Sequence, residues 1–478
     1  MPSSLGSLVT RKRRDVWSDV KHWRTLCPIL SISEDASCVG RPVGDANATI
    51  CNRPTPEASR RCERLIGDGY ALVDNLTGDA ICSGSDENNN VSAVIDCLSS
   101  AITSLHKQHG LPATFALLFD ETWQLAQTCS RVLSESTHAN NSFNFDMLAW
   151  YVDPKEGMAG FSPHRDRQPD VAKDTFHNDG QAKYVTLWLA LSDATPENSC
   201  LYVIPKRCDP GYTDGDEDGE SEKADTDEAD PLQRALNSKE SYQNIRALPR
   251  CSGQAVLFTH RIMHWGSRGN ADNEHSSPRI AISFVSSDPS FEAPYIDPCC
   301  FTGSKIPPFE IRMLLCCAQL IIYHERFEVP KESIRACYEY VKELETKLDV
   351  SYRKKVFVEF VKAMKEDSEA SCSRGVASSI RLGDEGDDNI SGDGKDKDEE
   401  DEAVLEEMLD AEAGGYGEFQ DDFDDIDDGG NDSECFKEDE DGYSSSDEEQ
   451  GDDKGGCLLF GKRKSEDDHV RSSSKKLK

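Results

Sequence analysis

The sequence predicts a mostly β protein, built as a sandwich or jelly roll with flanking helices. Short segments rich in β-branched and aromatic residues are bounded by Pro, Gly, Asn or Asp at residues 145–152, 184–191, 200–205, 254–258 and 279–285. Their connections are long and irregular, which argues against alternating βαβ units. Segments with apolar residues at helical spacing lie before and after this block.

The elements follow in chain order. Residues 1–55 are polar and are expected to be mostly irregular, with a basic run at 11–14. A helix is predicted over 57–69, a short strand over 70–76, and helices over 91–109 and 114–134. Behind the β block, helices are predicted over 309–347, with Pro330 at a first helical position, and over 353–367. We therefore expect an N-terminal segment (1–55), a β-rich domain (56–300), a helical extension (301–368) and a tail (369–478).

The net charge of −37 is concentrated in two segments. Residues 381–460 contain 33 Asp+Glu and 5 Lys+Arg, and residues 214–230 contain ten acids and one lysine. The rest of the chain is nearly neutral. The tail cannot bury enough apolar surface to offset chain entropy, so we expect it to be disordered. Its acidic tract could bind basic proteins, and no direct contact with nucleic acid is expected.

Four further features indicate where in the cell the protein is found. The chain has 18 cysteines, none at C-x-x-C spacing, and no apolar run of the ~20 residues that a membrane span needs. The N-terminal residues lack the apolar stretch of a signal peptide. Basic clusters at 462–463 and 475–478 have the spacing of a bipartite nuclear signal. We expect reduced thiols in a soluble intracellular protein of the nucleus or cytoplasm.

A metal site is indicated by His164 and Asp166. In an extended segment, residues i and i+2 point to the same side, so this imidazole and carboxylate can converge on one ion. A third ligand is available from His260 or His264, which follow the segment 254–258. Two imidazoles and one carboxylate form the facial triad of non-haem Fe(II) oxygenases. This triad leaves coordination positions open for a chelating 2-oxoacid and for dioxygen.

A 2-oxoacid also needs a cation for its distal carboxylate, and the planar fork of arginine suits this task. Arg279 opens the predicted strand 279–285 and shares its parity with Ala281 and Ser283. Arg268 is the competing arginine, but it lies in a turn and is expected to face water or substrate.

The sequence resembles the phytanoyl-CoA dioxygenase family of 2-oxoglutarate oxygenases over about residues 57–290. The matching stretches are LIGDGYALVDN, SPHRD, LWLALSDATPENSCLYVIPKR, GQAVLFTHRIMHWGS and PRIAIS. The resemblance implies a double-stranded β-helix (jelly roll, cupin-like) with His264 as the distal metal ligand, because a Gly/Ser turn follows it. It also implies that Trp188 lines the cosubstrate pocket and that Ser267 lies beside the distal histidine.

The activity implied by this resemblance is hydroxylation of an organic substrate that uses Fe(II), 2-oxoglutarate and O2 and releases succinate and CO2. Asp166 is present where the halogenases of the family have a small residue. We expect a small-molecule or lipid substrate, although a protein side chain also fits, and a monomer.

Three departures from the family leave the substrate open. The turn reads Glu197-Asn198-Ser199 rather than Glu-Asn-Gly, the interval from His264 to Arg279 is long, and the loop 209–240 is enlarged and acidic. Phosphates, such as those of CoA, would be repelled by that loop. Two alternatives stand beside the oxygenase. One is a catalytically degenerate oxygenase fold that acts as an acidic-tailed nuclear interaction or histone-binding protein, and the other is a cupin-like zinc hydrolase.

Overall fold

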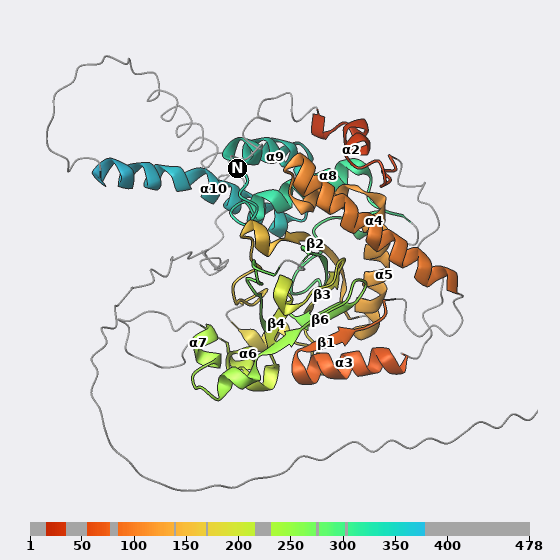
Figure 1. The fold of residues 1–478 in the computed structure, drawn as a ribbon, viewed down its shortest axis with the longest axis vertical. Coiled ribbons are helices and arrows are strands. Elements are labelled where there is room, and N and C mark those ends of the chain that lie inside the picture. Colours follow the sequence, from red (N-terminus) through yellow and green to blue (C-terminus); the bar gives the residue numbers. More distant parts are fainter. Residues whose placement is uncertain are drawn as a thin grey trace, which may run out of the picture. The chain divides into compact units, whose positions relative to one another are not determined.

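The computed structural model describes residues 16–34, 55–76, 85–137, 140–168, 171–215, 231–273, 277–301 and 305–377 (Figure 1). Most of the acidic run in the enlarged loop, and the tail beyond residue 377 with its basic end, lie outside this description. The predictions about disorder, nuclear entry and basic partners therefore stay predictions. No described helix is both long enough and apolar enough to cross a membrane.

Two antiparallel sheets form the centre of the fold. The strands are β1 (Tyr70–Val73), β2 (Ser142–Val152), β3 (Tyr184–Ala190), β4 (Leu201–Ile204), β5 (Arg246–Leu248), β6 (Ala255–Thr259), β7 (Met263–Gly266) and β8 (Arg279–Ser287). The larger sheet has the order β1-β6-β3-β8-β2, and the smaller has the order β5-β4-β7. A strand is present in each of the six segments predicted to form one, including β1 in the segment 70–76. The short strands β5 and β7 were not predicted; they are defined by pairing with β4.

The two faces of the larger sheet pack against different partners. On β3, Val185, Leu187 and Leu189 belong to the hydrophobic cluster that includes the helices. Trp188 and Ala190, on the other face, belong to a second cluster with residues of β4 and β6. Because successive side chains of a strand alternate, β3 is buried on both sides. This second face encloses the interior in which the functional residues lie.

Several helices pack against the larger sheet, and others pack against those helices. They are α2 (Val20–Leu26), α3 (Pro56–Asp68), α4 (Ser85–His109), α5 (Asp120–Ser136), α6 (Gly211–Asp214), α7 (Pro231–Ala235), α8 (Phe309–Ile322), α9 (Lys331–Leu344) and α10 (Val350–Ala377). Helix α3 lies along β1, and α5 packs against β2, β3 and β8 (Figure 1). Helix α8 packs against α9 and α10, and α10 continues past the predicted end of the extension at residue 368.

The predicted helix over 114–134 is interrupted. Residues Ala113–Leu118 form a 3-10 helix, Phe119 is extended (φ −98°, ψ 145°), and α5 begins at Asp120. The Asp120 carboxylate accepts hydrogen bonds from the Ser33 backbone N–H (2.9 Å) and from Arg312 Nη1 (2.6 Å). These long-range contacts restart the helix at a position that apolar periodicity cannot reveal.

The N-terminal segment contains α2, which the sequence did not predict. Trp23 is fully buried, and its ring stacks on Phe115 with ring centroids 4.7 Å apart. Its indole Nε1 donates a hydrogen bond to the Trp17 carbonyl oxygen (2.8 Å). The polar composition of residues 1–55 thus gives no sign of helix α2, which the buried Trp17 and Trp23 hold in place.

Candidate metal centre

The two histidines of the candidate site face each other across an antiparallel bridge. The His164 N–H donates to the His264 carbonyl, and the His264 N–H donates to the His164 carbonyl, both at 3.0 Å. The segment around His164 therefore extends the smaller sheet beyond β7, and the paired residues direct their side chains to the same side. Asp166, two residues after His164, shares that side.

Close backbone approach beside the site depends on two glycines. In the same antiparallel arrangement, the Gly266 N–H donates to the Phe161 carbonyl (3.0 Å) and the Gly160 N–H donates to the Ser267 carbonyl (3.3 Å). A Cβ atom added at Gly160 would collide with the backbone of Gly266. The glycine that follows His264 is therefore required by the packing of these two segments.

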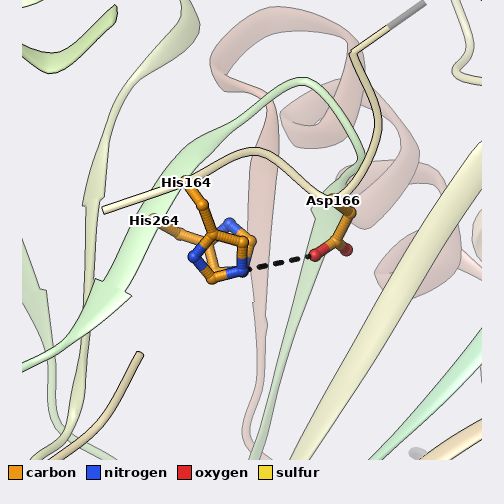
Figure 2. Close-up of side chains that lie close together, drawn as sticks. All are labelled: His164, Asp166 and His264. Atoms are coloured by element: carbon orange, nitrogen blue, oxygen red, sulfur yellow. Dashed lines mark ion pairs between the residues drawn. The ribbon is translucent and has the colours of Figure 1, made fainter. Parts of the chain in front are cut away.

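Donor atoms of His164, Asp166 and His264 all lie within 4.8 Å of one another (Figure 2). Asp166 Oδ1 is 3.5 Å from His264 Nε2 and 3.9 Å from His164 Nε2. The structure thus brings together the three residues proposed as ligands. His260 lies elsewhere, fully buried, with its Nε2 atom 2.8 Å from Thr175 Oγ1.

Backbone carbonyls fix the tautomer of both histidines. His164 Nδ1 lies 2.7 Å from the Ser162 carbonyl oxygen, and His264 Nδ1 lies 3.1 Å from the Ile262 carbonyl oxygen. A carbonyl oxygen only accepts hydrogen bonds, so each Nδ1 atom carries the proton. Each Nε2 atom therefore presents a lone pair toward Asp166, which is the arrangement that a bound cation requires.

Burial favours the neutral form of His264. Desolvation, and then the neighbouring His164, lower the pKa of His264 to about 4. The ring is therefore uncharged at neutral pH and can act as a ligand. Burial similarly lowers the pKa of His260 to about 3.

The Asp166 carboxylate is held from the larger sheet. Thr186 on β3 donates a hydrogen bond from Oγ1 to Asp166 Oδ2 (2.7 Å). Asp166 Oδ1 is the oxygen nearer to both histidines, so the two carboxylate oxygens have separate partners. Thr186 thereby orients the carboxylate without occupying the oxygen that faces the imidazoles.

Arg165 alternates with the candidate ligands and points away from them. Its guanidinium forms two hydrogen bonds with Asp209 (2.6 and 2.9 Å) and a third with the Arg261 carbonyl (2.5 Å). The side chains of Arg165 and Asp209 are both almost completely buried. This ion pair fastens the metal-site segment to the start of the enlarged loop.

Arg167 forms the second such anchor. It contacts Glu292 through Nε (2.6 Å) and Nη2 (2.9 Å), and its Nη1 donates to the Asp166 carbonyl (2.7 Å). The same guanidinium donates a hydrogen bond to Asp146 Oδ2 (3.3 Å). The other carboxylate oxygen of Asp146, Oδ1, accepts a hydrogen bond from Gln319 of α8. Neither arginine was predicted as a site residue, although the alternation in His-Arg-Asp-Arg indicates that Arg165 and Arg167 face opposite to the ligands.

Arg279, proposed to bind the cosubstrate, is deeply buried at the start of β8. It is 4% exposed, and its Nε atom has no hydrogen-bond partner among the residues that the structure describes. The guanidinium carbon lies 5.6 Å from the centre of the Trp188 ring. Among the described residues, no acid forms an ion pair with Arg279. Burial, and then the positive charge of Arg326, lower the pKa of Arg279 to about 9, so it stays protonated at neutral pH.

Arg279 and the metal site share one interior. Thr186 and Trp188 are two residues apart on β3, so their side chains lie on the same face. Thr186 holds Asp166, and Trp188 contacts Arg279. A continuous wall therefore connects the carboxylate of the triad with the buried guanidinium.

The other predicted residues lie at the edge of this interior. Ser267 follows β7, and its hydroxyl donates to the Pro196 carbonyl (3.3 Å). This contact places it beside the turn 196–198, and its predicted role beside the distal histidine stays a prediction. Arg268 is exposed, as its position in a turn predicts. Ser199 adopts a left-handed conformation (φ 77°), and its buried hydroxyl has no hydrogen-bond partner within the described ranges. The glycine expected there would avoid both costs.

The two antiparallel sheets thus hold two histidines and a carboxylate in an arrangement that could bind a metal ion. Residues 86–274 match the family model described as phytanoyl-CoA dioxygenase (PhyH), so the chain contains a domain of this family. The match ends before Arg279. No curated protein matches the sequence.

Several solved structures resemble parts of the chain at low identity. One is SnoN, a non-haem α-ketoglutarate-dependent epimerase from nogalamycin biosynthesis, with 18% identity, a TM-score of 0.30, and coverage of 48% of this chain and 80% of that one. Another is AviO1 from Streptomyces viridochromogenes Tue57, with 16% identity, a TM-score of 0.32, and coverage of 50% and 98%. A third is HygX from Streptomyces hygroscopicus, solved with nickel and 2-oxoglutarate, with 13% identity, a TM-score of 0.31, and coverage of 49% and 88%.

Proposed function

We propose that this protein is an Fe(II)- and 2-oxoglutarate-dependent dioxygenase that hydroxylates an organic substrate. The observation that carries the proposal is the pairing of two features in one interior. His164, Asp166 and His264 offer an incomplete ligand set, and Arg279 offers a buried cation that has no acid partner among the described residues. A buried charge of this kind is costly unless a ligand neutralises it.

The residues fit the cofactor in their chemistry. Two imidazole nitrogens and one carboxylate oxygen suit iron, and bound iron would supply the electrons that activate dioxygen. His164 and His264 would present Nε2, because their Nδ1 protons are engaged with carbonyls. Thr186 would keep Asp166 turned toward the metal.

The cosubstrate would lie between the metal site and Arg279. The planar guanidinium would bind the distal carboxylate of 2-oxoglutarate, and the Trp188 ring would form one wall beside it. Hydroxylation is the expected outcome because the metal carboxylate, Asp166, is present. No described contact favours the interaction-protein or zinc-hydrolase alternatives over this one.

The test is spectroscopic. Purified protein is mixed anaerobically with Fe(II) and 2-oxoglutarate, and the weak visible metal-to-ligand charge-transfer band is recorded. We expect the wild type to form the band and Asp166→Ala to lose it. Arg279→Gln should raise the 2-oxoglutarate concentration needed for half-maximal absorbance while leaving Mn(II) binding intact. Arg268→Gln, which removes an exposed arginine, is the matched control. A wild-type protein without the band would contradict the proposal.

A further inference from the structure

A second arginine approaches the metal site from the helical extension. Arg326 belongs to the segment after α8, which lies beyond the PhyH family match. Its guanidinium carbon lies 4.7 Å from the centre of the Phe161 ring, and its Nη2 donates to the Ala159 carbonyl. The Phe161 ring centre is in turn 5.2 Å from that of His164. The extension thus places a positive charge one aromatic ring away from a candidate metal ligand.

The charge of Arg326 is not matched by an ion pair within the described part of the chain. Glu328 acts on it electrostatically, but no carboxylate of a described residue forms an ion pair with it. Arg326 is close enough to Arg279 to lower the pKa of that buried group. Two neighbouring guanidinium groups repel each other, and the repulsion is strongest where water is scarce. Such an arrangement is stabilised by anions between or beside the two groups.

Arg279 and Arg326 differ in whether a negative charge of the proposed cofactors would offset them. Fe(II) carries two positive charges, which Asp166 and one carboxylate of 2-oxoglutarate would offset. The distal carboxylate would offset Arg279. After these pairings Arg326 is a cation beside the site that has no ion-pair partner among the described residues, so a further anionic group would complete the balance.

An apolar wall adjoins Arg326. Phe327 stacks on Trp150 with ring centroids 5.6 Å apart, and Phe161 meets Trp150 edge-on at 4.8 Å. Phe161 and Phe327 are partly exposed, and both pack against the second hydrophobic cluster that lines the interior. A molecule that reaches Arg326 would therefore also contact aromatic surface.

We propose that Arg326 and the rings of Phe161, Trp150 and Phe327 form the substrate-binding wall, and that the substrate is a small molecule with a carboxylate on an aromatic or apolar body. This inference deepens the proposed function and rests on it. The carboxylate would bind Arg326 and the apolar body would lie along the rings, so the carbon to be oxidised would face the metal site.

The test uses binding to the metal-free protein, which does not depend on turnover. Saturation-transfer NMR compares 3-phenylpropanoate with its neutral amide, which differs only in the charged group. In the wild type we expect about a tenfold preference for the carboxylate, the value of one charge-assisted hydrogen-bond pair. Arg326→Gln should remove the preference, Arg326→Lys should keep part of it, and Arg279→Gln should leave it intact.

Several results would overturn the inference. They are a wild-type protein that binds acid and amide equally, a preference that survives Arg326→Gln, and a preference that Arg279→Gln removes. In the last case the substrate carboxylate and 2-oxoglutarate would both bind at Arg279. Thermal melting of each variant checks that Arg326→Gln folds, and Arg326→Lys keeps the test valid if it does not. The charge-transfer band, measured separately, tells failure of this inference from failure of the proposed oxygenase.

Discussion

The hydrogen bond from Thr186 to Asp166 provides the sharpest test of how the metal site is organised. Thr186→Val replaces the hydroxyl with a methyl group of similar volume and leaves the three candidate metal ligands unchanged. The lost contact is a 2.7 Å hydrogen bond to a carboxylate. Such bonds contribute about 1.5 to 3 kcal/mol, and the corresponding changes around metal ligands weaken metal binding about 10- to 100-fold.

The exposure of Asp166 decides where in this range the effect lies. Its side chain is 18% exposed, so water can replace part of the lost contact. We therefore expect the low end, about a tenfold weaker affinity or about 1.4 kcal/mol. Mn(II) is a suitable probe because it shares the preference for carboxylate and imidazole ligands and is stable in air. Isothermal titration gives its dissociation constant.

Two further variants make this measurement decisive. Thr186→Ser keeps the hydroxyl and should bind Mn(II) within about twofold of the wild type. Ser286→Ala removes a buried hydroxyl from the neighbouring strand that has no hydrogen-bond partner, so it should leave the affinity unchanged. If Thr186→Val binds as tightly as the wild type, or if Thr186→Ser weakens binding equally, the reasoning is refuted.

Three other predictions concern stability. Arg165→Gln leaves the buried Asp209 carboxylate without its partner and should cost about 3 to 5 kcal/mol in urea denaturation, whereas a loss below 1 kcal/mol would refute a tight anchor. His260 stays neutral in the folded protein, but in the unfolded chain it gains a proton below its ordinary pKa of 6.5. Because only the unfolded state binds this proton, the free energy of unfolding should fall by about 2 kcal/mol between pH 7 and pH 5. His260→Gln should remove the share of this slope that comes from His260, while the share of His264, whose pKa burial also lowers, remains. An unchanged slope would exclude His260 as a source. Ser199→Gly relieves a left-handed serine and a buried hydroxyl and should raise the melting temperature, and a fall would contradict this account.

Much of the site could be predicted because its signals are local. The spacing of His164 and Asp166 is a property of extended backbone, and Arg279 shares the parity of a strand whose alternating faces are both buried. The segments that became β3, β6 and β8 are long enough to display β-type composition. These features need no knowledge of what lies across the interior.

Other features depend on contacts between distant residues. The interruption of the predicted helix at Phe119 is set by Asp120 contacts with Ser33 and Arg312. Strand β7 exists because it pairs with β4 on one side and with the His164 segment on the other. Arg326 follows a helix and carries no local sign of function. Its proximity to Phe161 is created only by the packing of the extension.

The position of β8 has a practical consequence for work with fragments. This strand lies between β2 and β3 in the larger sheet, yet it begins five residues after the family match ends at residue 274. A recombinant piece cut at 86 and 274 would lack β1 at one edge and would split the sheet through its middle. It would also lose Arg279, Glu292, Gln319 and Arg326. Inactivity of such a piece would say nothing about the proposed activity, because an informative fragment must run through the helical extension.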